Sequence, residues 1–174
     1  MVNLVIQRVN DDREWQNALA AVKRKGGQWE GPARMLVDLE LFRCEAPMRL
    51  VVKASRQGVV AHSEIRDLGT AEYAARIAGL SNTVVRPGLR RHGIYSAIIY
   101  LRNVLLDRSD FQFVAARVKK GHEQRYMQQY PGFTRVKKED EFGAAWLLRP
   151  IGPRSIDEAV WGVVKHLETK VKKW

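Results

Sequence analysis

Residues 84–96 read Val-Val-Arg-Pro-Gly-Leu-Arg-Arg-His-Gly-Ile-Tyr-Ser, and this stretch decides the fold. The apolar run from Leu80 to Val85 predicts a strand, which Pro87-Gly88 ends. The run from Gly93 to Leu106 is apolar nearly all round, which is typical of a helix sandwiched within a core. The segment therefore predicts a strand, a basic loop and a buried helix in direct succession.

The loop within this segment has the features of an anion-binding site. The first backbone N–H groups of a helix have no partner inside the helix, and the helix dipole favours a negative charge beside them. Arg90, Arg91 and His92 add positive side chains, and Gly93 would let a phosphate approach the backbone closely. The alternative interpretation is a basic surface turn that caps the helix and binds no ligand.

The same residues resemble the acetyl-CoA signature of the GNAT acetyltransferase superfamily. That signature, Val-x-Pro-x-x-Arg-x-x-Gly-x-Gly/Ala, joins the fourth strand of the family to its third helix. The matching positions here are Val85, Pro87, Arg90, Gly93 and Ile94. Gly132-Phe133 resembles the Gly-Phe pair that follows the family's fourth helix, and the resemblance extends from residue 2 to about residue 149. Tyr95 departs from the pattern, because the family usually has Gly or Ala there.

The resemblance implies a mixed α/β fold of the GNAT type, with a mostly antiparallel central sheet flanked by helices. Hydrophobic periodicity places further strands at residues 2–9, 49–54, 59–65, 111–118, 133–136 and 144–148. It places helices after Asn10 or Asp11 and ending at Gly26-Gly27, from Pro32 to Phe42, and from His122 to Tyr130. Residues 1–150 are expected to form the acyl-CoA-binding domain. Residues 151–174 add an amphipathic helix behind a capping box of Ser155 and Glu158.

The resemblance also implies that the protein binds acetyl-CoA. The expected cofactor-binding residues are Val84, Val85, Arg90, Arg91, His92, Gly93, Ile94, Tyr95, Ser96 and His122. Backbone N–H groups of Val84 or Val85 would hold the carbonyl oxygen of the acetyl group. A tyrosine of the fourth helix would protonate the thiolate, and Tyr126 is preferred to Tyr130, which sits against Pro131.

The base that accepts the proton of the amine is open at this stage. No carboxylate occurs between Glu72 and Asp107, so the fourth strand of the family offers none. His62 and Glu64 alternate onto one face of the preceding strand, and Ser81 would hold a water for either of them. The alternative is that His62 and Glu64 are ordinary solvated residues and that the two tyrosines are ordinary half-buried aromatics.

The composition describes a globular chain of 174 residues with a formal net charge of +11. The single cysteine, Cys44, excludes an intramolecular disulfide, and we expect a soluble cytoplasmic protein with no membrane segment and no metal. The positive charge favours anionic partners such as RNA, an acidic protein or a phosphorylated cofactor, and the alternative interpretation is a solvated surface rich in lysine and arginine.

Three functions remain open from the sequence. The first is an acetyltransferase that moves an acetyl group from acetyl-CoA to a primary amine. The second is a GNAT-like protein without catalysis that serves as a binding or structural component and docks a partner, or a second copy, through the 155–174 helix. The third is a nucleic-acid-binding module built on a run of cations: Arg117, Lys119, Lys120, Arg125, Arg135, Lys137 and Lys138.

Overall fold

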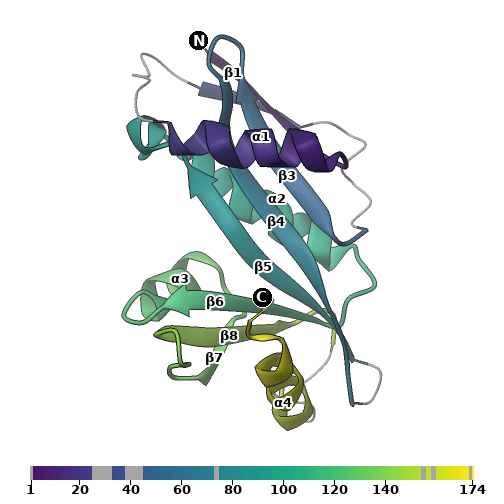
Figure 1. Cartoon of the computed structure of the whole chain (residues 1–174). Helices are drawn as coiled ribbons and strands as arrows, with labels where there is room; N and C mark the ends of the chain where they lie inside the picture. The colour runs from purple at the N-terminus through teal and green to yellow at the C-terminus, as the bar shows by residue number, and fades with distance from the viewer. Residues whose placement is uncertain are drawn as a thin grey trace. The chain divides into compact units, whose positions relative to one another are not determined.

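The computed structural model describes residues 2–24, 33–37, 45–72, 75–153, 156–157, 160–172 and 174 (Figure 1). The elements follow in the order β1 (Val2–Arg8), α1 (Asp12–Lys23), β2 (Ala33–Val37), β3 (Met48–Ala54), β4 (Gly58–Ala71), β5 (Ala75–Val85), the 3₁₀ turn η3 (Pro87–Leu89), α2 (Ile94–Asp107), β6 (Phe113–Lys119), α3 (Glu123–Gln129), β7 (Thr134–Lys137), β8 (Ala144–Pro150) and α4 (Val160–Lys170).

Within the described residues, eight strands form one sheet in the order β2-β1-β3-β4-β5-β6-β8-β7. β1 pairs parallel with β2 and antiparallel with β3. β5 pairs parallel with β6, and β6–β8 and β8–β7 are antiparallel. The mixed α/β architecture predicted from the sequence is confirmed.

The chain divides into two compact units, which we describe separately. The first comprises residues 1–64 and 82–108, and the second comprises residues 65–81 and 109–174. β4 and β5 each contribute residues to both units, because these are long strands of 14 and 11 residues.

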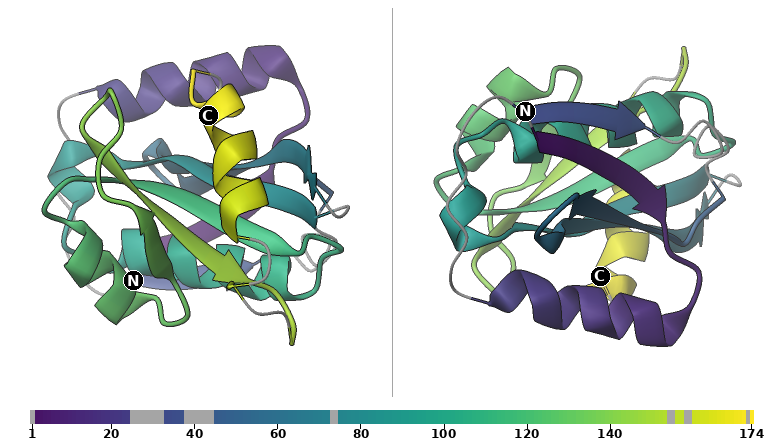
Figure 2. Two further views of the ribbon diagram at one scale, coloured as in Figure 1. Left: turned by 90° about the horizontal axis from the view of Figure 1, so that it is seen from below. Right: turned by 90° about the horizontal axis from the view of Figure 1, so that it is seen from above.

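In the first unit, α1 lies across one face of the strands (Figures 1 and 2). Asp11 caps the helix, and its Oδ1 accepts a hydrogen bond of 2.7 Å from the Glu14 backbone N–H. The buried side chains of Trp15 and Ala18 pack against Val9 of the chain leaving β1 and Val51 of β3. Leu4 and Ile6 of β1 are buried and alternate with exposed Asn3 and Val5, as the period of a strand predicts.

Helix α2 covers the opposite face of the same unit. Ile94, Ile98 and Leu105 are fully buried, and the Arg102 guanidinium reaches the Glu64 backbone carbonyl of β4 at 3.4 Å. The helix is not buried all round, however, and that prediction was wrong: Tyr95 is 41% exposed and Tyr100 is 72% exposed. The aromatic rings that raised the apolar content of this segment lie on the solvent side.

The second unit has its own core beneath α4, which lies beside β8 (Figure 2). Val163 and Leu167 of α4 are fully buried against a cluster that includes Phe113, Trp146 and Leu148. The apolar stripe predicted for the C-terminal helix therefore packs on the protein's own sheet. Trp161, which lies off that stripe, is 84% exposed.

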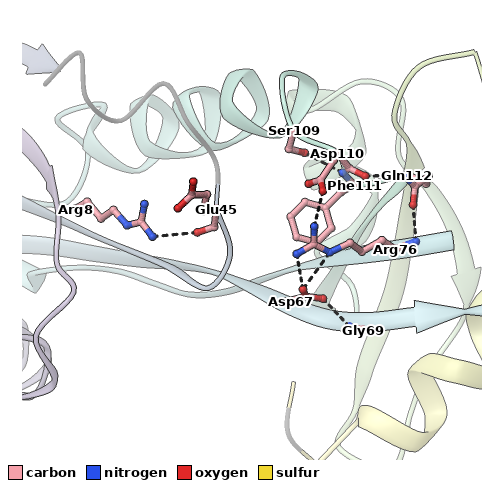
Figure 3. Close-up of polar contacts among 9 residues, drawn as sticks. All are labelled: Arg8, Glu45, Asp67, Gly69, Arg76, Ser109, Asp110, Phe111 and Gln112. Carbon is pink, nitrogen blue, oxygen red and sulfur yellow. Dashed lines mark hydrogen bonds and ion pairs between the residues drawn. The ribbon is translucent and has the colours of Figure 1, made fainter. Parts of the chain in front are cut away.

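In the second unit, Arg76 of β5 forms hydrogen bonds with β4 and with the loop that enters β6 (Figure 3). Its guanidinium donates to Asp67 of β4 at 2.8 Å and to Asp110 at 2.6 Å, and it lies 4.5 Å from the centre of the Phe111 ring. Its backbone N–H donates to Gln112 Oε1 at 2.6 Å, and the Gln112 N–H donates to the Arg76 carbonyl at 2.9 Å. These contacts fix where β6 starts beside β5.

Three sequence predictions differ from the structure or lie outside it. The helix expected at Pro32–Phe42 is wrong over residues 33–37, which form β2; the rest of that range is outside the described residues. Packing beside β1 overrides helix propensity there, because the register from Val2↔Ala33 to Ile6↔Val37 supplies strand hydrogen bonds. The expected helix stop at Gly26-Gly27 and the Ser155–Glu158 box also lie outside the described residues, and α1 ends at Lys23 with Arg24 as its C-cap. No described helix is both long and apolar enough to cross a bilayer.

Candidate active site

The basic loop after β5 is anchored to β4 at its first residue, Arg86. Arg86 donates from its backbone to the Val60 carbonyl at 2.9 Å and from its guanidinium to the Val59 carbonyl at 2.6 Å. Leu89 is fully buried beneath the loop. Arg90, Arg91 and His92, which precede Gly93 and α2 in the chain, are exposed.

Gly93 makes the entry into α2. It adopts the left-handed conformation at φ +75° and ψ −2°, and no side chain caps the helix it precedes. An added Cβ would meet no heavy atom within 4 Å, so the glycine is not required by packing inside this protein. The first N–H groups of α2, at Ile94, Tyr95 and Ser96, lack intrahelical acceptors and lie beside this space. The arrangement fits a phosphate group that approaches the backbone closely.

His62 and Glu64 lie on the α1 face of β4, as the strand alternation predicts. The His62 ring packs edge-on against Trp15 of α1 at 5.4 Å between ring centres. Glu64 Oε2 accepts a hydrogen bond of 2.9 Å from Asn82 Nδ2, and Glu64 Oε1 lies 3.9 Å from Arg49 Nε. Neither is a solvated surface residue, because His62 is 5% exposed and Glu64 is 6% exposed.

The surroundings of His62 lower its pKa. Burial is the largest cause, because the low-dielectric interior penalises the imidazolium ion. Hydrogen bonding to the Asn82 backbone and the nearby Glu64 act in the opposite direction, and Lys23 of α1 adds to the lowering. At neutral pH the imidazole is therefore uncharged, which is the form that can accept a proton.

Val84, Val85 and Ser81 occupy the last part of β5. Val85 is buried and Val84 is 37% exposed, and the Val85 carbonyl accepts a long hydrogen bond of 3.4 Å from Arg90 Nε. Ser81 is half-buried and belongs to the second unit. The expected roles of these residues in holding an oxyanion or a water remain predictions.

The two candidate acids, Tyr126 and Tyr130, belong to the second unit. Tyr126 is on α3 and Tyr130 is its C-terminal cap, and the two rings are 4.8 Å apart. Tyr126 also packs edge-on against Phe133, and Tyr130 is 7% exposed. The expectation that both tyrosines share one side of the helix is met. His122 is the exposed N-cap residue of α3, without a side-chain capping bond, so its expected cofactor contact stays a prediction.

The cation run considered for nucleic-acid binding is largely engaged in ion pairs. Arg117 pairs with Asp140 at 2.9 Å and Lys137 with Glu168 at 2.7 Å. Lys120 pairs with Glu139 and Arg135 with Glu123. Four of the seven cations are thus partly neutralised, and this reduces the positive field that a phosphate backbone would meet.

Sequence reasoning missed Asn82 and Arg49, which complete the surroundings of Glu64. The signal for Asn82 was present, since asparagine is depleted in strands and is among the residues that best tolerate a left-handed conformation. Arg49 gave no such signal, because its approach to Glu64 depends on strand pairing across the sheet.

Among the described residues, no group of three or more His, Cys, Asp or Glu side chains is placed to hold a metal ion.

No protein-family model matches the sequence, and no curated protein matches it significantly. Solved structures do match the fold. The NatC complex bound to Gag peptide and CoA contains a chain with a TM-score of 0.60, 10% identity, and coverage of 86% of this chain and 99% of that one. An N-acetyltransferase described as putative from Lactobacillus plantarum has a TM-score of 0.57 at 12% identity, with coverage of 86% and 99%. The ribosomal-protein-S18-alanine N-acetyltransferase of Escherichia coli has a TM-score of 0.55 at 13% identity, with coverage of 87% and 96%. The chain has the fold of the GNAT superfamily.

Proposed function

We propose that the protein is an acyl-CoA-dependent N-acetyltransferase that moves an acetyl group from acetyl-CoA to a primary amine. The observation that carries the proposal is the open, uncapped N-terminus of α2 behind left-handed Gly93, with Arg90, Arg91 and His92 beside it. Backbone N–H groups there would bind the pyrophosphate of the cofactor. Structural neighbours that are N-acetyltransferases support the reaction class.

Acetyl-CoA supplies the acetyl group as a thioester, whose carbonyl carbon the amine attacks as its bond to sulfur breaks. Backbone N–H groups at Val84 or Val85 would stabilise the negative charge that develops on the carbonyl oxygen. His62, uncharged at neutral pH, would take the proton that the amine loses, with Glu64 as the alternative base. Tyr126 would deliver a proton to the departing sulfur. The acceptor is an amine, and its identity beyond that is left open.

Calorimetric titration of the protein with acetyl-CoA tests the proposal at its first step. We expect saturable one-to-one binding at micromolar concentrations, because several backbone and cationic contacts converge on the pyrophosphate. CoA without the acetyl group should bind similarly, since it carries the same phosphates. A folded protein that binds neither compound would rule out the acetyltransferase and leave a GNAT-fold binding component as the better account.

We predict that Tyr126→Phe lowers kcat at least tenfold and leaves acetyl-CoA affinity unchanged. The change removes one hydroxyl group and keeps the ring that packs on Tyr130 and Phe133. The measurement is thiol release from acetyl-CoA in the presence of an accepted amine. Tyr130→Phe is the matched control and should retain most activity. Equal losses in the two variants, or no loss in Tyr126→Phe, would remove the assigned role of Tyr126.

A further inference from the structure

The interior of β5 contains a residue in a conformation that strands do not use. Asn82 has φ +52°, in the left-handed region, although it lies three residues before the end of the strand. Such backbone conformations cost free energy and persist only where the surroundings hold them in place. Asn82 is also exposed, so burial of its side chain does not offset this cost.

The inverted backbone allows Asn82 to contact both ionisable groups of β4. Its side-chain amide donates to Glu64 Oε2 at 2.9 Å, and its backbone hydrogen-bonds to the His62 ring. A residue with ordinary strand geometry presents its side chain on one face and its backbone polar groups in the plane of the sheet. From its left-handed position, Asn82 makes a side-chain contact with Glu64 and a backbone contact with His62, two residues apart on the adjacent strand β4.

The His62 ring also has a buried nitrogen atom without a hydrogen-bond partner among the described residues. Its Nδ1 atom is shielded from solvent and makes no hydrogen bond to any of the described residues. A buried ring nitrogen without a partner is costly, and such atoms often contact a bound water or ligand that completes the site. The ring packs edge-on against Trp15 and hydrogen-bonds to the Asn82 backbone.

We propose that Asn82 is a positioning residue that orients His62 and Glu64 for proton transfer from the acceptor amine. This inference rests on the proposed acetyltransferase function. The ionisable groups that act on His62 are Glu64 on its own strand and Lys23 of α1, and Arg49 of β3 lies 5.6 Å from the centre of the Trp15 ring. Asn82 itself carries no charge. Its substitution therefore changes geometry and hydrogen bonding without changing the charge around the His62 ring.

Two substitutions separate the side-chain contact from the backbone contact. Asn82→Gly removes the amide that binds Glu64 but keeps the left-handed backbone, so the contact with His62 remains. Asn82→Ala removes the amide and also disfavours positive φ, so both contacts are weakened. Asn3→Gly and Asn3→Ala, at an exposed position of β1, are the matched controls.

Nuclear magnetic resonance titration measures the pKa of the His62 ring, and this measurement does not need an acceptor amine. We expect Asn82→Ala to lower the His62 pKa further, because the backbone contact that raises it is lost while burial remains. Asn82→Gly should leave that pKa unchanged. An unaltered His62 titration in folded Asn82→Ala would overturn the proposal, and His62→Gln assigns the resonance.

The steady-state rate of thiol release from acetyl-CoA tests the same proposal in catalysis. Both Asn82 variants should lose about tenfold in kcat, with KM for acetyl-CoA unchanged. In Asn82→Ala the acid limb of the pH profile should move to lower pH with the His62 pKa. Wild-type kcat in Asn82→Gly would overturn the role of the side chain, even if the alanine variant failed to fold. If the proposed acetyltransferase function is wrong, this would appear separately, because the wild-type protein would not bind acetyl-CoA in the calorimetric titration.

Discussion

Gly93→Glu should abolish measurable acetyl-CoA binding and leave the protein folded. The expected loss of affinity is at least a hundredfold, or about 2.7 kcal/mol of binding free energy. The new carboxylate would stand at the start of α2, where it would exclude the pyrophosphate by volume and repel it by charge. Because no heavy atom lies within 4 Å of the added Cβ, the side chain has room in the free protein.

Calorimetry measures this loss, and a second glycine provides the control. Gly152 has the same φ of +75° and likewise no atom within 4 Å of an added Cβ. Gly152→Glu therefore imposes the same backbone strain, about 1 kcal/mol, and adds the same charge to the second unit, which does not contain the loop. It should bind acetyl-CoA as the wild type does. Retained binding in Gly93→Glu, or equal loss in both variants, would show that the loop does not hold the pyrophosphate.

Asp140→Ala should lower the free energy of unfolding by about 3 kcal/mol, and the melting temperature by roughly 10 °C. The Asp140 side chain is 3% exposed and binds Arg117 at 2.9 Å. Oδ2 also accepts from Trp146 Nε1 at 2.7 Å, and Oδ1 accepts from the backbone N–H groups of Phe142 and Ala144. Removing the carboxylate would leave the guanidinium and these donors without their buried acceptor.

The stabilisation that Asp140 provides should disappear in acid. Burial opposes ionisation more than any single contact favours it, yet the hydrogen bonds from Trp146, Ala144 and Phe142, with the charge of Arg117, together lower the pKa of Asp140. A carboxyl group with a lowered native pKa stabilises the fold fully above its unfolded pKa. The contribution is then lost as the pH falls through the native pKa. Wild type and Asp140→Ala should therefore converge in stability at low pH.

Thermal and urea unfolding check both parts of this prediction. Asp110→Ala is the matched control, because Asp110 also pairs with an arginine but is 73% exposed. Water and salt screen an exposed pair, so its loss should cost well under 1 kcal/mol. If the two variants lose the same stability, or if the Asp140→Ala difference persists in acid, then the buried acceptor is not what holds this corner of the second unit together.

Apart from residues 33–37, the sequence alone predicted the order of elements in the described residues, and it predicted the loop that carries the proposed function. The β5–loop–α2 segment was readable because its signals are local. Pro87 ends a strand, Gly93 permits positive φ, and the apolar positions of α2 follow the helical period. The N-cap of α1 at Asp11 is local in the same way. Local chemistry acts within a few residues and is therefore visible in one chain.

Tertiary structure decided what local chemistry could not. Residues 33–37 form β2 because β1 offers a parallel partner, and no pattern within five residues encodes a neighbour thirty residues away. Likewise, Tyr95 and Tyr100 count as apolar in a sequence profile, but α2 turns them outward while Ile94 and Ile98 fill the core. Burial depends on which face the sheet occupies, and only the assembled fold fixes that face.

The candidate site shows the same division. His62 and Glu64 were recognised by their alternation on one strand, but their burial and their tie to Asn82 arise from the pairing of β4 with β5. Arg49 comes to Glu64 from a third strand, fifteen residues earlier in the chain. The sequence determines which ionisable groups are available, whereas hydrogen bonding across strands determines their solvation and orientation, and therefore which of them can exchange a proton near neutral pH.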